Sequence, residues 1–160
     1  MINNDILRSV RYMLKLNEFE LAEVVKMGGG DVTQAEINTY IKKEDEPGFV
    51  ACKQNVLSHF LNGLIILKRG PSPDGKTAPT ELPTNNVVLK KLRVAFQLKD
   101  DDILAILKEA GFDVSKNEVS ALFRKEGHIN YRVCGDQFLR NFLKGLTLRL
   151  RPDLSDSKSL

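Results

Sequence analysis

The amino-acid sequence contains two copies of one pattern, and this internal duplication constrains the fold more than any other feature. Residues 3–69 align with residues 85–151 without a gap, and 19 of the 67 aligned positions are identical. Many of the other pairs exchange one apolar residue for another. A gapless match of this length indicates two tandem copies of one structural unit.

A segment rich in proline and glycine separates the two copies. Four of the six prolines in the chain lie within residues 70–83, where a helix cannot continue. We therefore predict a first helical repeat at 1–69, a linker at 70–84, a second repeat at 85–152 and a polar tail at 153–160. A pseudo-two-fold pairing of the repeats is natural, although a linker of this length also permits independent modules.

Each copy is predicted to form four helices, because its apolar residues recur at helical spacing. The third helix has the clearest start signal, a capping box in which a hydroxyl and a carboxylate each bind the other residue's backbone amide. These boxes are residues 33–36 and 115–118. The first helix is expected to begin after Asn4 in one copy and Asn86 in the other, which we interpret as N-cap residues.

The remaining helices have weaker boundary signals. The second helix of each copy opens with acidic residues and ends at glycine, as suits the helix dipole and a C-cap. The third helix of the second copy is expected to reach residue 125, and the fourth helix to begin near Cys52 or Asp136. Only Tyr131–Cys134 could form a short strand. The predicted fold class is all-α, with two tandem, homologous four-helix units.

The sequence holds no arrangement typical of an enzyme or a metal centre. Cys52 and His59 are about 10 Å apart along a helix, which is too far for a nucleophile and its base. The second copy keeps Cys134 but has Asn141 in place of the histidine. Two scattered cysteines and two scattered histidines are also too few for a zinc site. We expect buried structural cysteines, no metal and no catalytic activity.

The glycine run at residues 28–30 resembles a phosphate-binding loop in composition, but the neighbouring elements differ from those of such a loop. A phosphate loop follows a strand and leads into a helix, whereas this run follows a predicted helix. The second copy keeps only Gly111 of the run, so a helix C-cap explains the pattern. The acidic run at 100–102 is interpreted as a solvated helix start. No cofactor is expected.

The sequence shows no signal for export or membrane insertion. Charged residues interrupt the first fifteen positions, so the apolar core of a signal peptide is missing. The longest uncharged apolar run, residues 64–67, is far shorter than the roughly 18 residues of a spanning helix. We therefore expect a cytoplasmic protein with reduced thiols and no membrane contact.

The formal net charge of +3 is divided unequally between the copies. Residues 1–70 hold nine basic and nine acidic residues, whereas residues 84–152 hold thirteen basic and eight acidic residues. A basic half favours a polyanionic partner such as nucleic acid. A surplus of this size is also compatible with a solubilising surface.

Residues 103–125 have the outline of a helix-turn-helix. Its turn, at about five residues, is longer than the usual three or four, and any solvated helix face could show similar side chains. The exposed residues are of types that bind phosphates or read base edges. We predict a non-enzymatic binding protein that contacts nucleic acid through this face, which carries Lys116, Asn117, Ser120, Arg124 and Lys125.

A protein–protein interaction adaptor is the alternative interpretation. Such a protein would use an apolar groove between the repeats, or the four consecutive apolar residues at 64–67, which exceed what one helix face needs. The nucleic-acid hypothesis predicts binding that weakens as the salt concentration rises, whereas the adaptor hypothesis predicts a protein complex that is insensitive to salt.

Two repeated motifs and one segment of the first copy resemble those of a known family. They are an Asn-Asn pair at the start of each copy, Val-(Thr/Ser)-x-x-Glu before each third helix, and Phe-Leu-Asn-Gly-Leu-Ile-Ile-x-Lys-Arg-Gly at 60–70. Together they resemble the YehS-like family, small duplicated bacterial proteins of unknown function. The resemblance covers residues 1–152 and implies a bacterial cytoplasmic protein with two domain copies. The family has no assigned activity, and the second copy departs from the 60–70 segment at residues 142–151.

Overall fold

The structure, a computed structural model, describes residues 1–154. These residues contain the helices α1–α8 and a further helical stretch at 152–154. Those residues contain no strand, so the all-α prediction is confirmed and the stretch around Tyr131 is irregular chain. Most of the predicted tail lies outside the described residues. The first repeat consists of α1 (Asn3–Leu14), α2 (Glu18–Met27), α3 (Gln34–Tyr40) and α4 (Gln54–Arg69). The second consists of α5 (Asn85–Phe96), α6 (Asp100–Glu109), α7 (Lys116–Leu122) and α8 (Asp136–Leu150).

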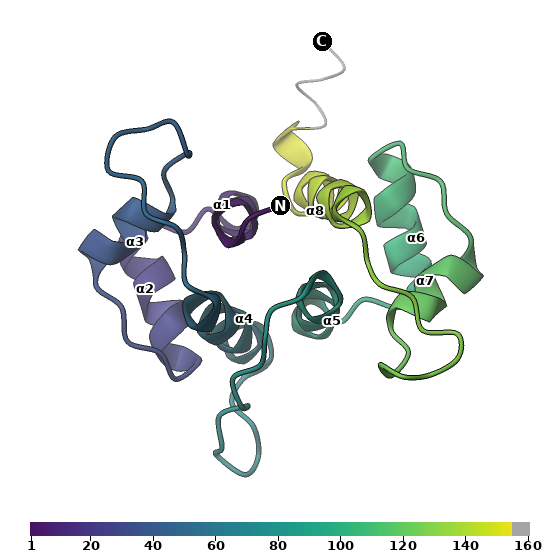
Figure 1. Cartoon of the computed structure of the whole chain (residues 1–160), viewed down its shortest axis with the longest axis horizontal. Coiled ribbons are helices and arrows are strands. Elements are labelled where there is room, and N and C mark those ends of the chain that lie inside the picture. The colour runs from purple at the N-terminus through teal and green to yellow at the C-terminus, as the bar shows by residue number, and fades with distance from the viewer. Residues whose placement is uncertain (155–160) are drawn as a thin grey trace.

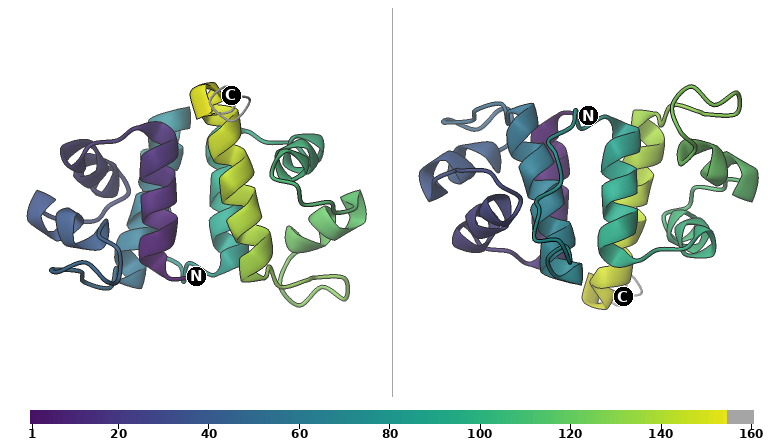
Figure 2. Two further views of the ribbon diagram at one scale, coloured as in Figure 1. Left: turned by 90° about the horizontal axis from the view of Figure 1, so that it is seen from above. Right: turned by 90° about the horizontal axis from the view of Figure 1, so that it is seen from below.

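The two repeats pack side by side about a pseudo-two-fold axis that lies along the line of view in Figure 1. The axis exchanges α1 with α5 and α4 with α8. Helix α1 therefore packs beside α8, and α4 packs beside α5, while the second and third helices of each repeat lie at the outer ends (Figures 1 and 2). The repeats are thus joined through four central helices and do not form separate modules.

One continuous apolar core joins the repeats. Leu7 and Phe60 of the first repeat and Leu89 and Phe142 of the second are fully buried in the same cluster. Burial of a side chain of this size stabilises the fold by roughly 1.5–3 kcal/mol. The apolar run at 64–67 is partly used in this packing, because α4 contacts both α2 and α5.

The prediction that Asn4 and Asn86 are N-cap residues is wrong. Helices α1 and α5 begin at Asn3 and Asn85, two residues earlier than predicted, and their N-caps are Ile2 and Thr84. Asn4 is only 1% exposed, and its side chain bonds the chain that follows α3 instead of its own helix end. The sequence signal was real, because asparagine repeats at both positions, but it marks a tertiary contact.

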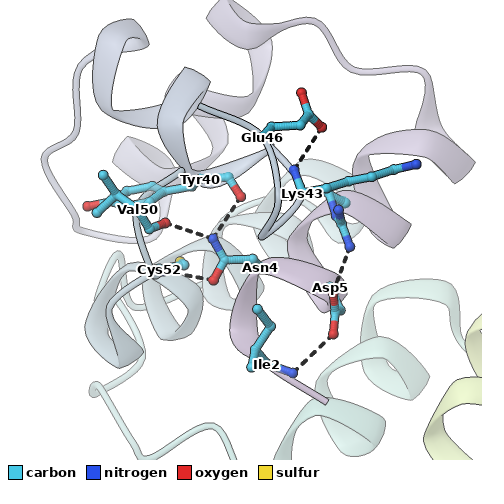
Figure 3. A network of polar contacts seen from close by, with 9 residues as sticks. Ile2, Asn4, Asp5, Tyr40, Lys43, Glu46, Val50 and Cys52 are labelled. Carbon is cyan, nitrogen blue, oxygen red and sulfur yellow. Dashed lines mark hydrogen bonds and ion pairs between the residues drawn. The ribbon is translucent and has the colours of Figure 1, made fainter. Parts of the chain in front are cut away.

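The Asn4 side chain makes three hydrogen bonds (Figure 3). Its Nδ2 donates to the carbonyl oxygens of Tyr40 and Val50, at 3.0 and 2.9 Å. Its Oδ1 accepts from the amide of Cys52 at 2.9 Å. This side chain therefore holds the loop between α3 and α4 against α1, which satisfies backbone groups that no helix reaches.

Asn86 repeats this arrangement in the second repeat. It donates to the carbonyls of Leu122 and Arg132, at 3.0 and 2.9 Å, and accepts from the amide of Cys134 at 2.8 Å. Both copies thus use one asparagine to fix the path of the chain after the third helix. Helix α4 begins at Gln54, two residues after the predicted start near Cys52. The Cys52 amide donates to Asn4, so Cys52 belongs to the loop that this asparagine holds.

The capping boxes are confirmed, but the third helices end early. Ser115 Oγ accepts from the amide of Glu118 at 3.1 Å, and Thr33 caps α3 in the same way. Helix α7 ends at Leu122, whose carbonyl bonds Asn86 instead of an amide of a further turn. The prediction that the helix reaches residue 125 is therefore wrong.

Glycines allow the second and fourth helices to approach closely. A Cβ added at Gly63 would overlap the carbonyl oxygen of Val24, and one added at Gly145 would overlap that of Ile106. Gly28 ends α2 against the backbone of α4, so packing explains the glycine run without a phosphate.

Candidate functional site

A groove beside α7 is the surface where the predicted nucleic-acid residues and their neighbours meet. We call it the α7 groove; it has a volume of about 520 Å³. Two asparagines, two arginines, a tyrosine and an exposed isoleucine are among its walls. Its lining consists of Asn117, Glu118, Ala121, Arg124, Ile129, Asn130, Tyr131 and Arg132.

The five predicted contact residues do not share one surface in the structure. Asn117 and Arg124 line the α7 groove. Arg124 also lines an adjacent hollow of about 350 Å³, together with Lys125 and with Lys90 of α5. Arg124 and Lys125 belong to the loop after α7, and not to the helix as predicted.

The other two predicted residues face the start of α6. The Lys116 ammonium lies 3.7 Å from the carboxylate of Asp101, and the Ser120 hydroxyl donates to Asp100 at 3.4 Å. Asp100 also pairs with Arg93 at 2.9 Å. These acidic partners offset the charge of Lys116 and engage Ser120, so this side of α7 is less suited to phosphate than the groove side.

The arginines of the α7 groove are electrostatically available. Within residues 1–154, neither Arg124 nor Arg132 has a carboxylate within ion-pair distance. Both side chains are exposed. The one acid in the lining, Glu118, accepts a hydrogen bond from the Ser115 amide in the capping box. The groove therefore presents two unpaired guanidinium groups to a ligand.

The first repeat lacks an equivalent surface. The pseudo-two-fold axis relates Arg132 to Val50 and Asn130 to Gly48, so a cation and an amide are lost. Lys42 takes the place of Arg124, and its ammonium donates to the carbonyl of Pro47 at 3.1 Å. Arg132 was not among the contact residues predicted from the sequence. A difference between the copies could have indicated it, because Arg132 takes the place of the apolar Val50.

A second groove lies between the repeats, on the face formed by α1 and α8. We call it the α1–α8 groove; its volume is about 610 Å³. The adaptor hypothesis places an apolar groove between the repeats, yet this one has four cationic side chains in its lining. They are Arg8, Arg11, Lys43 and Arg140.

The two cysteines are buried, free thiols. Burial raises the pKa of the Cys52 thiol to about 12. The pKa of Cys134 is also raised to about 12, by burial and by the nearby negative charge of Asp136. A thiol with such a pKa stays protonated near neutral pH and is a poor nucleophile or metal ligand.

No group of three histidine, cysteine or acidic side chains in residues 1–154 lies close enough together to hold a metal ion. In the same residues, every helix is too short or too polar to cross a lipid bilayer.

Comparison with known proteins gives a family but no activity. Residues 3–70 and 85–151 match the family described as "Protein of unknown function (DUF1456)". The chain is 52% identical over 150 residues to a protein of Escherichia coli (strain K12) described as "Uncharacterized protein YehS". This match covers 93% of the present chain and 96% of that protein. No solved structure matches at a significant level.

Proposed function

The chain belongs to the DUF1456 family of proteins of unknown function, as its resemblance to YehS-like proteins indicated, and we propose from its own surface that it is a non-enzymatic nucleic-acid-binding protein. The α7 groove is the proposed contact surface. The observation that carries the proposal is the pair Arg124 and Arg132, which flank the groove without carboxylate partners within residues 1–154.

Phosphate contact is the first part of the proposed interaction. Arg124 and Arg132 supply planar guanidinium groups that can bind phosphate oxygens in pairs. Lys125 adds a third exposed cation next to Arg124. Contacts of this kind fix the position of a nucleic acid without reading its sequence.

Base contact is the second part. Tyr131 is half-buried in the groove wall and offers a ring on which an unpaired base can stack. Asn117 and Asn130 carry amides that both donate and accept hydrogen bonds, as base edges require. Because α7 has only seven residues, we favour nucleic acid with accessible bases over a helix inserted deeply into a duplex groove.

The proposal is tested by fluorescence anisotropy with a labelled single strand and a labelled duplex of random sequence. Three phosphate contacts predict that affinity falls about 40-fold for a duplex when salt rises from about 50 to about 200 mM, since each contact contributes about 0.9 to the logarithmic slope. The double variant Arg124→Ala/Arg132→Ala should bind much more weakly and lower this slope by roughly 2.

The first repeat supplies the matched control. Lys42→Ala removes the cation that corresponds to Arg124, and it should leave the affinity and the salt slope unchanged. The proposal is overturned if the wild-type protein binds neither probe at the lower salt concentration. It is also overturned if the double variant and the Lys42 variant bind equally well.

A protein partner is the second candidate, and one observation favours it. Ile129 and Val133, on the loop that borders the α7 groove, are 92% and 74% exposed. Contiguous exposed apolar surface marks protein contacts, and these two side chains lie four residues apart on one loop. A partner that binds here should be retained at high salt and lost in the variant Ile129→Ser, which separates this candidate from nucleic acid.

A further inference from the structure

The pseudo-two-fold axis makes two faces of the molecule equivalent, yet within residues 1–154 a linker covers only one of them. One face is formed by α1 and α8, and the other by α4 and α5 (Figure 2). The linker leaves the end of α4 and runs back along that helix toward the start of α5 (Figure 2). The corresponding space on the first face is the open α1–α8 groove.

Specific polar groups hold the linker on its face. Asn62 donates to the carbonyls of Ala78 and Pro79, at 3.3 and 3.4 Å. The Ser58 hydroxyl accepts from the amide of Glu81 at 3.2 Å, and the Glu81 carboxylate pairs with Lys91 at 3.1 Å. The occupant of this face is therefore an extended peptide that carries one negative charge.

The open face has different groups at the equivalent positions. Arg140 replaces Ser58, and Lys144 replaces Asn62, so the two side chains that bind the linker backbone become cations. Ser9 replaces Lys91. Arg140 and Ser9 line the α1–α8 groove, which places it where Glu81 lies on the other face. The open face is thus suited to an anion and not to a peptide backbone.

Arg11 has no acidic partner of its own within residues 1–154, in contrast to its equivalent in the second repeat. Its equivalent in the second repeat, Arg93, pairs with Asp100 at 2.9 Å and lies 4.4 Å from the ring centre of Phe123. Arg11 has neither contact within residues 1–154, and its Nε is buried without a hydrogen-bond partner there. A buried guanidinium nitrogen without an acceptor is unfavourable, and an anion that binds the accessible part of the Arg11 guanidinium from the groove would balance its positive charge.

Within residues 1–154, the charges of the groove leave Arg11 and Lys43 without an acidic partner, whereas Arg140 interacts at longer range with the negative charge of Asp136. Arg8 is paired with Asp5 at 2.6 Å, which uses one positive and one negative charge. Within the described part of the chain, Arg11, Lys43 and Arg140 form no ion pair. Figure 3 shows Lys43 on the same side of α1 as Asp5, and both line the groove.

We propose that the α1–α8 groove binds the phosphate groups of a small phosphorylated molecule, between Arg11, Lys43 and Arg140. Its volume of about 610 Å³ lies in the range of small-molecule sites, which is roughly 300–1,000 Å³. The hydroxyl of Ser9 gives the rest of the ligand a polar contact, and the half-exposed ring of Tyr12, over which the Arg151 guanidinium lies at 4.6 Å, borders the groove. This site is separate from the α7 groove.

Isothermal titration calorimetry with inorganic pyrophosphate and with ATP, both without metal, tests the proposal on the full chain. Both probes should bind the wild-type protein. Lys43→Ala and Arg140→Ser should each weaken binding roughly 10-fold or more, because each removes a charge-assisted contact. Both side chains are exposed, so thermal unfolding of these variants should match the wild type.

The repeat again supplies a crossed control. Lys125 is the equivalent of Lys43, so Lys125→Ala should leave pyrophosphate binding unchanged, and Lys43→Ala should leave oligonucleotide binding unchanged. The proposal is overturned if neither probe binds at millimolar concentration, or if Lys43→Ala and Lys125→Ala have equal effects. It is also overturned if Lys43→Ala weakens only oligonucleotide binding, because the phosphates would then come from nucleic acid.

Discussion

Replacing Asn4 with alanine should destabilise the whole molecule by about 3 kcal/mol. The substitution removes three hydrogen bonds, to Tyr40, Val50 and Cys52, at 2.9–3.0 Å. Each such bond contributes about 1 kcal/mol net, and the Asn4 side chain is too deeply buried for water to replace it freely. In a chain of this size, that loss lowers the melting temperature by about 6–12 °C.

Urea unfolding followed by circular dichroism measures this change. Asn86→Ala should be as damaging as Asn4→Ala, because its three bonds are the same. Asn3→Ala is the control; it removes one partly buried bond, to the carbonyl of Cys52 at 3.1 Å, and should cost about 1 kcal/mol. The reasoning is refuted if Asn4→Ala is no more destabilising than Asn3→Ala, and a separate transition for one repeat would contradict the shared core.

Two further predictions concern the glycines and the thiols. Gly63→Ala and Gly145→Ala should each destabilise the fold by about 1–3 kcal/mol or more, because the new methyl group overlaps a backbone carbonyl of the neighbouring helix. Urea unfolding of Gly135→Ala provides the comparison, because a Cβ at Gly135 meets nothing within 4 Å and the backbone there has a negative φ of -77°. Cys52 and Cys134 should react with a thiol reagent at pH 8 only after unfolding. Their pKa values of about 12 keep both thiols protonated in the folded protein. Rapid reaction of the native protein would contradict this prediction.

Much of the fold could be predicted because its signals are local. The capping boxes that begin α3 and α7 involve residues three positions apart, so the sequence displays them completely. The role of Asn4 could not be read in this way, because its partners lie 36 to 48 residues away. An asparagine near a helix start has the same local appearance whether it caps the helix or bonds a distant loop.

The candidate site was predicted only in part, for a related reason. Asn117 and Arg124 were chosen from a helix face that was expected to continue to residue 125. The chain leaves the helix at Leu122, where Asn86 binds the carbonyl, and the loop then brings Arg132 beside Arg124. That pairing depends on the path of the loop, which helical periodicity does not describe.

The sequence alone determined that the chain is helical, duplicated and divided by a proline-rich linker. These properties follow from spacing, repetition and the backbone limits of proline, which act within a few residues. Tertiary structure decided how the repeats pair and what becomes of the two equivalent faces. The linker contacts Ser58 and Asn62 on one face, whereas within residues 1–154 no linker covers the cationic groove of the other face. A single chain has one linker between two repeats, so a duplicated sequence folds into a pair whose equivalent faces differ.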